Sequence, residues 1–320
     1  MLLRRFVFAA ALLALLISAA WIWGAHQVRA GIDAWAAERR TAGWTVDWSD
    51  EAIGGFPFSL IIRLQNPILG RPDHWGWSAE AITLRVSVLD RRHIHATAPG
   101  RHGLTLGPWS GAGKADTLDG DLVIDRVGRV STVQISGQGL TLAPIGLQAL
   151  AVSFGPGTTF ALSLAGLELP EMSRPVLDRR ISMLELDGHV TGPWPADTFE
   201  QWRAGGGTVE IEHLGLEWPP LMIDGEGTAA LDSASQPLAA FSARVRGLSP
   251  MMDRLVAAGV VDKAAATAAK VLVAVLSKPD AQGRGTVNAP FTLQDGALWM
   301  GPARLFAVPP LPTQWVQPPR

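Results

Sequence analysis

The chain begins with an apolar run that contrasts with the alternating pattern after it. Phe6–Trp23 reads FVFAAALLALLISAAWIW, eighteen residues without a charge or a proline, and Arg4 and Arg5 stand directly before it. As a helix, this run is about 27 Å long, enough to cross the hydrocarbon core of a bilayer. Trp21 and Trp23 stand at its far end, where aromatic side chains favour the membrane–water boundary. The pattern predicts a transmembrane anchor over residues 1–24.

The basic flank predicts the orientation of this anchor. Arginines are retained on the cytoplasmic side of a membrane, so we expect a single-pass inner-membrane protein with the bulk of the chain in the periplasm. The alternative is a signal peptide that is cleaved after Ala20, with Ser18 and Ala20 at the −3 and −1 positions. The apolar run continues past this point through Ile22, which favours retention. Both interpretations place the remainder of the chain outside the cytoplasm.

Residues 25–43 change to a helical pattern with charges. Ile32, Trp35 and Ala36 recur on one face, Arg39 and Arg40 fall in the last turn, and Gly43 is a typical helix stop. We predict a helical stalk that continues from the anchor.

From residue 44 to residue 311 the period changes to two, which is typical of half-buried strands. Two runs are clearest, one at residues 58–64 and one at residues 82–88. Further alternation follows at residues 160–164 and 241–245. The positions that we expect to face inward on the clearest runs are Phe58, Leu60, Ile62, Leu64, Ile82, Leu84, Val86, Val88, Leu162 and Leu164.

Turn signals separate the alternating runs. Asp-Gly pairs occur at residues 119–120, 187–188, 224–225 and 295–296, and this dipeptide suits the positive φ angles of a tight hairpin. The spacing predicts a long antiparallel meander of roughly twelve to sixteen strands.

A helical sequence pattern returns near the C-terminus. Ser249 suits a helix N-cap and Pro250 suits the first helical position, and an alanine-rich stretch follows. We predict two short helices at about 250–277 that pack on the sheet, a short helical interruption at residues 195–203, and a loose tail over residues 312–320.

Composition restricts the function further. The chain has no cysteine, so the exported part must be stabilised by burial rather than by disulfides. The formal net charge is −2, the mean hydropathy is +0.18, and no run of Lys or Arg occurs outside the N-terminal flank. Binding of nucleic acid through charge is therefore not expected.

Candidate chemistry is sparse. No nucleophile elbow, zinc-protease motif or phosphate-binding loop occurs. On a strand, His93 and His95 would share a face as metal ligands, with Asp90 as a third, but Arg91 and Arg92 would repel a cation, so exposed positions are the favoured interpretation. Glu210 and Glu212 are better explained by a solvated strand face than by glycoside hydrolysis. We expect a protein that is not an enzyme and has no cofactor.

The sheet itself suggests a binding surface. A sheet this long must close, curl or be covered to hide its apolar face, and only one modest helical segment is available to cover it. We therefore predict a mainly β fold: an N-terminal transmembrane helix, a long, curved, trough-like antiparallel sheet over residues 44–311, and the short helical pair. The inward residues named above would line an apolar groove that suits acyl chains.

Several segments resemble a known family. The N-terminal anchor, GGFPF at residues 54–58, the helices from Pro250 and the closing FTLQDGALWMGPARLFAVPPL at residues 291–311 look like the proteobacterial domain-of-unknown-function family numbered 2125. The resemblance covers almost the whole chain and carries over no catalytic residue. Its strand-rich layout is similar to that of AsmA-like envelope proteins, and this fold-level analogy implies a trough linked to phospholipid handling.

Three hypotheses follow. The first is a membrane-anchored periplasmic protein whose apolar groove binds or shields a phospholipid or another acyl ligand, with residues 6–23 in the membrane lipid. The second is a structural or interaction module of an envelope complex with a closed core and no ligand. The third is an envelope hydrolase, which would require Asp90, His93 and His95 to converge in a cleft.

Overall fold

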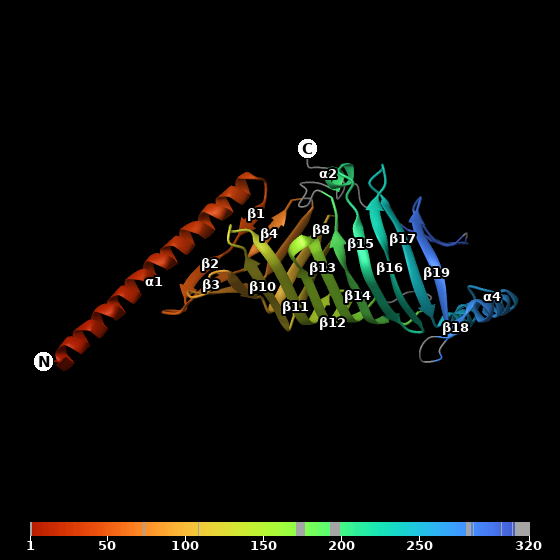
Figure 1. Ribbon diagram of the computed structural model, residues 1–320, viewed down its shortest axis with the longest axis horizontal. Coiled ribbons are helices and arrows are strands. Elements are labelled where there is room, and N and C mark those ends of the chain that lie inside the picture. The colour runs from red at the N-terminus through yellow and green to blue at the C-terminus, as the bar shows by residue number, and fades with distance from the viewer. Residues whose placement is uncertain are drawn as a thin grey trace. The chain divides into compact units, whose positions relative to one another are not determined.

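A single helix, α1 (Leu2–Thr41), forms the first part of the structure, a computed structural model (Figure 1). The described residues are 2–72, 74–107, 109–170, 177–192, 199–279, 283, 285–301, 303–308 and 310. Among them, α1 alone is long and apolar enough to cross a membrane. It continues through the predicted anchor and stalk without a break at residue 24, and it ends before Gly43, where φ is +80°.

The predicted fold class is confirmed: the chain is mainly β and antiparallel, with a long N-terminal apolar helix and a short helical pair near the C-terminus. It divides into two compact units, residues 1–133 and 134–320, which are described separately below. The predicted tail at residues 312–320 lies outside the described residues.

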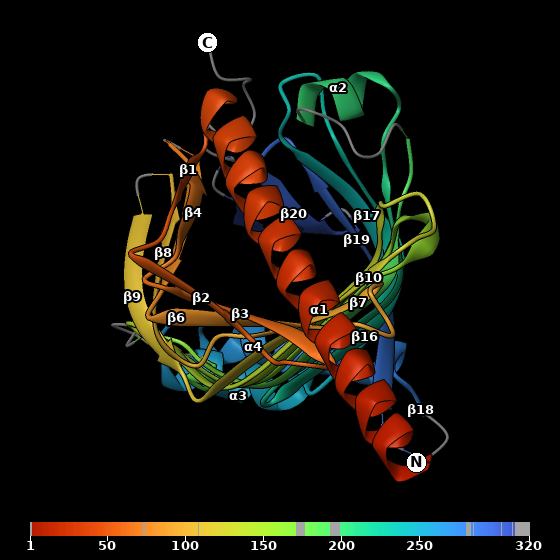
Figure 2. The same cartoon turned by 90° about the vertical axis from the view of Figure 1, so that its left-hand side faces the viewer.

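In the first unit, the second half of α1 packs on strands. The Trp21 indole N–H donates to the Ser59 carbonyl at 3.0 Å, and the Trp21 ring meets the Phe56 ring edge-on with 5.8 Å between centroids. Further along, Arg29 pairs with Glu51 at 3.0 Å and Ala36 is fully buried. These contacts fix the helix against this unit, and Figure 2 shows α1 passing in front of β3.

The strands of the first unit form two runs of five, and the chain passes back and forth between them. Every described pairing is antiparallel. One run has the order β1 (Thr45–Asp47), β4 (Ile68–Arg71), β5 (Trp75–Ala79), β8 (Gly100–Leu106) and β9 (Trp109–Ala115). The other has the order β2 (Asp50–Gly54), β3 (Ser59–Gln65), β6 (Ala81–Ser87), β7 (His93–Thr97) and β10 (Thr117–Ile124).

The second unit is the predicted meander. After β11 (Val130–Leu142), which leads into it, most strands pair with the next strand in the chain (Figure 1). Their order is β12 (Ile145–Phe154), β13 (Thr159–Glu168), β14 (Arg180–Val190), β15 (Val209–Trp218), β16 (Leu221–Leu231), β17 (Pro237–Arg246), β19 (Gly285–Gln294), β20 (Ala297–Met300) and β21 (Ala303–Ala307). The two-residue β18 (Lys278–Pro279) pairs with the start of β19.

The described residues contain 21 strands, more than the predicted twelve to sixteen. Part of the difference comes from short strands such as β4 and β18, which carry too few alternating positions to be seen in the sequence. A 3-10 turn, η1 (Pro156–Thr158), joins β12 to β13.

Three helices interrupt the meander. The short α2 (Phe199–Ala204) overlaps the predicted interruption at residues 195–203 where that segment is described and ends one residue beyond it, and its Trp202 is buried. The predicted helical pair is present as α3 (Leu248–Ala257) and α4 (Lys263–Leu276), and these helices contact each other. They form an excursion between β17 and β19, which still pair directly at Val245 and Val287.

The predicted start of α3 is wrong by two residues. The N-cap is Gly247 rather than Ser249, and it makes no side-chain capping hydrogen bond. Gly247 has a φ of +83°, and a Cβ placed on it would lie 1.8 Å from the Pro220 carbonyl oxygen. A glycine is required here because the chain reverses direction while its backbone passes close to a neighbouring turn.

Three of the four Asp-Gly turn predictions are also wrong. Only Asp295-Gly296 is a turn, between β19 and β20, with both φ angles positive. The pairs at residues 119–120, 187–188 and 224–225 lie inside β10, β14 and β16. A Cβ on Gly188 would lie 2.0 Å from the Glu210 carbonyl oxygen, so this glycine serves close strand-to-strand approach rather than a reversal of the chain.

Two glycines with similar φ angles test the role of Gly247. Gly259 has a φ of +69° with nothing within 4 Å of a Cβ, so G259A should cost only the strain of the left-handed backbone, about 1–2 kcal/mol. G247A adds a collision with backbone atoms and should lower the apparent Tm much further, as measured by circular dichroism of the full chain in mild detergent. Equal losses in the two variants would show that the close approach at Pro220 does not matter.

Candidate functional site

The predicted groove residues of the first unit are brought together on neighbouring strands. Leu60 lies opposite Val86, Ile62 opposite Leu84, and Leu64 opposite Ile82 on β3 and β6. Directly opposite residues of an antiparallel pair project from the same face. Ile53 of β2, and Ile94 and Leu122 further along the run, continue this face.

Phe58 and Val88 differ from the other predicted residues of this unit. β3 begins at Ser59, so Phe58 lies in the turn before it and is largely exposed. Val88 follows β6, and its backbone N–H donates to the Phe58 carbonyl at 3.0 Å. Both residues therefore belong to the end of the sheet rather than to the middle of its face.

The opposite face of the same strands is polar. Arg63 and Thr83 are paired positions there, and so are Arg85 and His95. A hydrogen bond of 2.8 Å joins His95 Nδ1 to Asp121 Oδ1. This run of the sheet is consequently charged on one face and apolar on the other, where Glu51 opposite Leu64 is a charged exception that pairs with Arg29.

The second unit shows the same division over many more strands. Leu162 lies opposite Leu186 and Leu164 opposite Leu184, so both predicted residues belong to one continuous face. We call it the apolar face. Its register positions, from β12 to β20, are Leu150, Val152, Phe154, Phe160, Leu162, Leu164, Leu184, Leu186, Gly188, Val190, Val209, Ile211, Leu214, Leu216, Trp218, Leu221, Ile223, Gly225, Gly227, Ala229, Leu231, Pro237, Ala239, Phe241, Ala243, Val245, Val287, Ala289, Phe291, Leu293, Leu298 and Met300.

None of these positions carries an ionisable side chain. Glu168 and Arg180 share the register of the apolar face and lie opposite each other in the strand pairing, at the end of β13 and the start of β14. The charged residues of these strands occupy the other register, among them Glu185, Asp224 and Arg244. The sheet of this unit therefore has one apolar and one polar face.

An irregularity in β15 keeps this division intact. Val209 and Ile211 alternate in one phase, whereas Leu214 and Leu216 alternate in the other. The register shifts between Ile211 and Leu214, opposite the step from Asp187 to Gly188. This bulge inserts one residue, so that both halves of β15 present their apolar residues to the same face.

The side chains of the apolar face are only partly covered. Among the described residues no large side chain is fully buried, and most of the buried hydrophobic residues are alanines. Leu162, Leu186, Leu216 and Phe241 are all half-buried. A closed core would bury its largest side chains most completely, so the apolar face retains surface that the described parts of the protein do not cover.

The polar face of the second unit carries an ionic cluster. His213 lies 3.8 Å from both Glu185 and Asp224, and Arg244 pairs with Asp224. His213, Asp224 and Arg244 border a shallow, open hollow of about 310 Å³. The described residues contain no group of three or more His, Asp or Glu side chains arranged to hold a metal ion.

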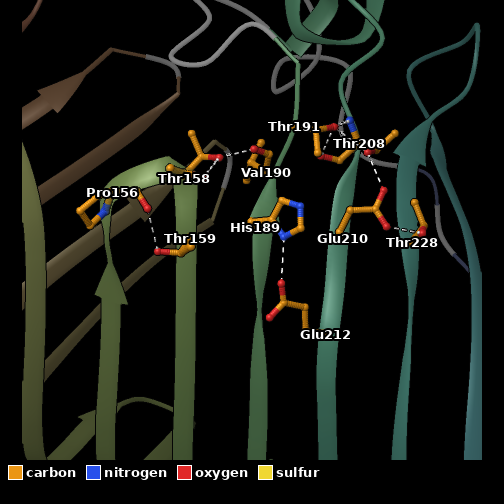
Figure 3. A network of polar contacts seen from close by, with 11 residues as sticks. Pro156, Thr158, Thr159, His189, Val190, Thr191, Thr208, Glu210, Glu212 and Thr228 are labelled. Carbon is orange, nitrogen blue, oxygen red and sulfur yellow. Dashed lines mark hydrogen bonds and ion pairs between the residues drawn. The ribbon is translucent and has the colours of Figure 1, made fainter.

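A second polar network lies at the end of β14, β15 and β16 (Figure 3). Glu210 accepts hydrogen bonds from the hydroxyls of Thr228 at 2.6 Å and Thr208 at 2.9 Å, and the Thr208 and Thr191 hydroxyls are 2.7 Å apart. The Thr191 carbonyl also accepts the Trp202 indole N–H at 2.8 Å, which attaches α2 to the sheet. The hydrogen bonds from Thr228 and Thr208 lower the pKa of Glu210 below its ordinary value of 4.5.

Glu210 and Glu212 therefore have separate structural partners. Glu212 accepts or shares a hydrogen bond with the His189 ring at 3.1 Å, on the neighbouring strand (Figure 3). Both carboxylates stabilise strand pairing, in agreement with the solvated strand face that the sequence favours over a hydrolytic pair.

The histidine cluster of the first unit is exposed. His93 pairs with Asp90, and His95 pairs with Asp121 on another strand. Asp90, His93 and His95 do not meet in a cleft, so the condition set for the hydrolase hypothesis is not met by these residues. His102 is a contrasting case: it stacks on Trp77 with 6.1 Å between centroids, and burial lowers the pKa of its imidazole.

Several residues of the apolar face were missed from the sequence. Leu184, Leu186, Leu214, Leu216 and Ile223 alternate with polar residues just as the predicted positions do. The Asp-Gly pairs next to them suggested turns and hid the length of the strands. The signal was present, but only the register shows that these strands continue through their glycines.

Comparison with known proteins gives a family but no function. Residues 21–309 match the model of a family described as "Uncharacterized protein conserved in bacteria (DUF2125)". No curated protein and no solved structure matches the chain. The similarity to AsmA-like envelope proteins stays a prediction.

The Glu210 network predicts a pH dependence of stability. Because the folded-state pKa of Glu210 is lowered, its stabilising contribution is fully present above the ordinary value of 4.5 and is lost as the pH falls through the lowered pKa. E210Q should therefore be less stable than the parent chain at neutral pH, and the difference in Tm should shrink on acidification.

T228V, which removes the strongest donor to Glu210, should give the same trend in thermal unfolding monitored across pH. E217Q serves as the control, because Glu217 is exposed on the same strand and has no described hydrogen bond. A stability difference for E210Q that stays constant into acid would contradict this role of Glu210.

Proposed function

This chain belongs to the uncharacterised bacterial family DUF2125, and we propose from its own residues that it is a membrane-anchored, non-enzymatic envelope protein that binds or shields an acyl lipid. The lipid-binding surface is the apolar face of the second unit. In the first unit, a separate apolar surface of the same kind surrounds the buried Ile62 and consists of Leu60, Leu64, Ile82, Leu84 and Val86. α1 crosses the inner membrane, and the strands lie in the periplasm.

The observation that carries the proposal is the apolar face itself. Apart from Glu168 and Arg180 at its edge, its positions extend over strands β12 to β20 without an ionisable side chain, and its leucines and phenylalanines are half-buried rather than enclosed. Exposed apolar surface costs about 25 cal/mol for each Å², so a large uncovered face favours an apolar occupant. Acyl chains have no polar groups to satisfy, and they suit a surface that offers no hydrogen-bond partners.

The membrane supplies such an occupant directly. None of the described side chains in the apolar part of α1 is buried, and most are exposed, as expected of a segment surrounded by lipid. A protein held at the membrane by this helix meets acyl chains at high local concentration, so even a weakly binding apolar face would be occupied.

Adjacent residues on one strand provide a matched test. Leu216 belongs to the apolar face, whereas Glu217 is exposed on the opposite face. Leu216→p-benzoylphenylalanine in the full chain should form phospholipid adducts on irradiation in native membranes, and Glu217→p-benzoylphenylalanine should form few. Mass spectrometry of the purified protein identifies the adducts, and Leu162 and Ser163 form a second such pair.

The same experiment separates lipid binding from a scaffold with a closed core. A scaffold would give no lipid adduct from either position and no phospholipid co-purified in mild detergent. In a closed core, Leu186→Ala would also cost about 2–5 kcal/mol of unfolding free energy. If Leu186 is instead half-exposed and covered by lipid, Leu186→Ala should lower the unfolding free energy by less than this in detergent, which replaces the lipid.

A further inference from the structure

Three turns of the first unit meet at one end of its sheet. They are residues 55–58, 88–92 and 125–129, and we call them the turn cluster. The Val88 N–H donates to the Phe58 carbonyl at 3.0 Å, and the Ile124 N–H donates to the Arg92 carbonyl at 2.9 Å. The pairings of Ser59 with Ser87 and of Val123 with His93 place the ends of β3, β6, β7 and β10 side by side.

Each of these turns carries an exposed apolar side chain. Phe56 is 54% exposed, Phe58 72%, Leu89 90% and Val127 73%. These side chains come from three separate turns, yet the strand pairing brings them to one edge, about 15 Å across at roughly 4.8 Å per strand. Exposed apolar side chains that are grouped in this way are typical of a surface that contacts a membrane or another protein.

Basic side chains accompany the apolar tips. The turn cluster contains Arg91, Arg92, Arg126 and Arg129, all exposed. Arg129 pairs with Asp125 at 3.6 Å, whereas no ion pair is described for the other three arginines in the parts of the chain that the structure covers.

The two aspartates of the turn cluster are already engaged. Asp90 pairs with His93 and accepts the Arg92 N–H, and Asp125 accepts the N–H groups of Val127 and Arg129 at 2.9 Å each. These carboxylates hold the turns in shape and leave the cluster with an excess of positive charge.

The contacts of α1 with the turn cluster set the position of this sheet edge along the axis of the helix. Trp21, in the last turn of the predicted membrane span, donates its indole N–H to the Ser59 carbonyl and packs against Phe56. The turn cluster therefore begins at the level where the helix leaves the hydrocarbon. Aromatic and basic side chains are the groups that favour this depth in a bilayer.

We infer that the turn cluster is a second membrane contact, in which Phe56, Phe58, Leu89 and Val127 insert into the headgroup region of the bilayer that α1 crosses. Arg91, Arg92 and Arg126 face the phosphates of anionic lipids there, and each adds about 1 kcal/mol of attraction near such a surface. This contact holds the edge of the sheet on the membrane, so that the first unit and the helix fixed to it cannot tilt freely relative to the bilayer.

The absence of cysteine from the chain allows a clean test by site-directed spin labelling. Single variants F58C, L89C and V127C of the full chain receive a nitroxide and are reconstituted in bilayers of phosphatidylcholine and phosphatidylglycerol. T117C is the control, because Thr117 is exposed at the other end of β10, about 25 Å from the turn cluster by strand geometry. Oxygen accessibility relative to a water-soluble nickel complex should be several-fold higher at positions 58, 89 and 127 than at 117.

The charge contribution is tested in the same samples. The R91Q/R92Q/R126Q variant should move the L89C label toward water in bilayers that contain phosphatidylglycerol and should change it little in pure phosphatidylcholine. The R63Q/R85Q variant, which removes two exposed arginines from the polar face of the strands, should leave the label in place.

This inference rests on the membrane anchoring proposed for α1, and an L13C label reads that anchoring separately, because Leu13 lies in the apolar run and is 59% exposed. The turn-cluster contact would be overturned, and the anchor left intact, by one result: a lipid-exposed L13C label together with L89C and V127C labels that are as accessible to water as T117C. A water-exposed L13C label would overturn both.

Discussion

The in-phase register of consecutive strands is the constraint on which the structure depends. In a strand, successive side chains alternate between the two faces, and a slip of one residue exchanges the faces completely. Strands β12 to β20 pair so that the main apolar alternation of each strand coincides with that of its neighbour, although Leu167, Ile181 and Met183 lie on the other face. A single out-of-phase strand would place charged residues such as Glu185 and Asp224 among the leucines. The penalty for burying an unpaired charge makes the observed register the stable one.

Local exceptions exist to protect this register. The bulge in β15 compensates for an odd spacing between Ile211 and Leu214. Gly188 allows the neighbouring backbone of β15 to approach so closely that no Cβ would fit between them. On the polar side, Glu210 binds the hydroxyls of Thr208 and Thr228 and secures the same strands near the bulge. The bulge, the close approach at Gly188 and the Glu210 hydrogen bonds thus all help to keep one face of the sheet apolar.

The first unit applies the same principle and also carries the long apolar helix. Its strands β3 and β6 have one apolar and one charged face, and α1 packs against this unit through Trp21, Arg29 and Ala36. One helix thereby provides both a segment long and apolar enough to cross a membrane and a contact surface for the strands. The turn cluster places its exposed apolar side chains and arginines at the end of the sheet where Trp21 is attached.

The sequence by itself determined the elements whose signal is local. An uninterrupted apolar run identifies α1, period-two alternation identifies strands such as β3, β6 and β13, and an alanine-rich stretch identifies α4, because each pattern is complete within one element. Tertiary structure decided what depends on a partner strand: the bulge in β15, the glycines that pass within strands instead of turning, and the start of α3 at Gly247. It also decided that Phe58 lies with Leu89 at the end of the sheet and not on its face. An Asp-Gly pair has the same composition in a hairpin as in a strand, and only the distance to the neighbouring backbone distinguishes the two.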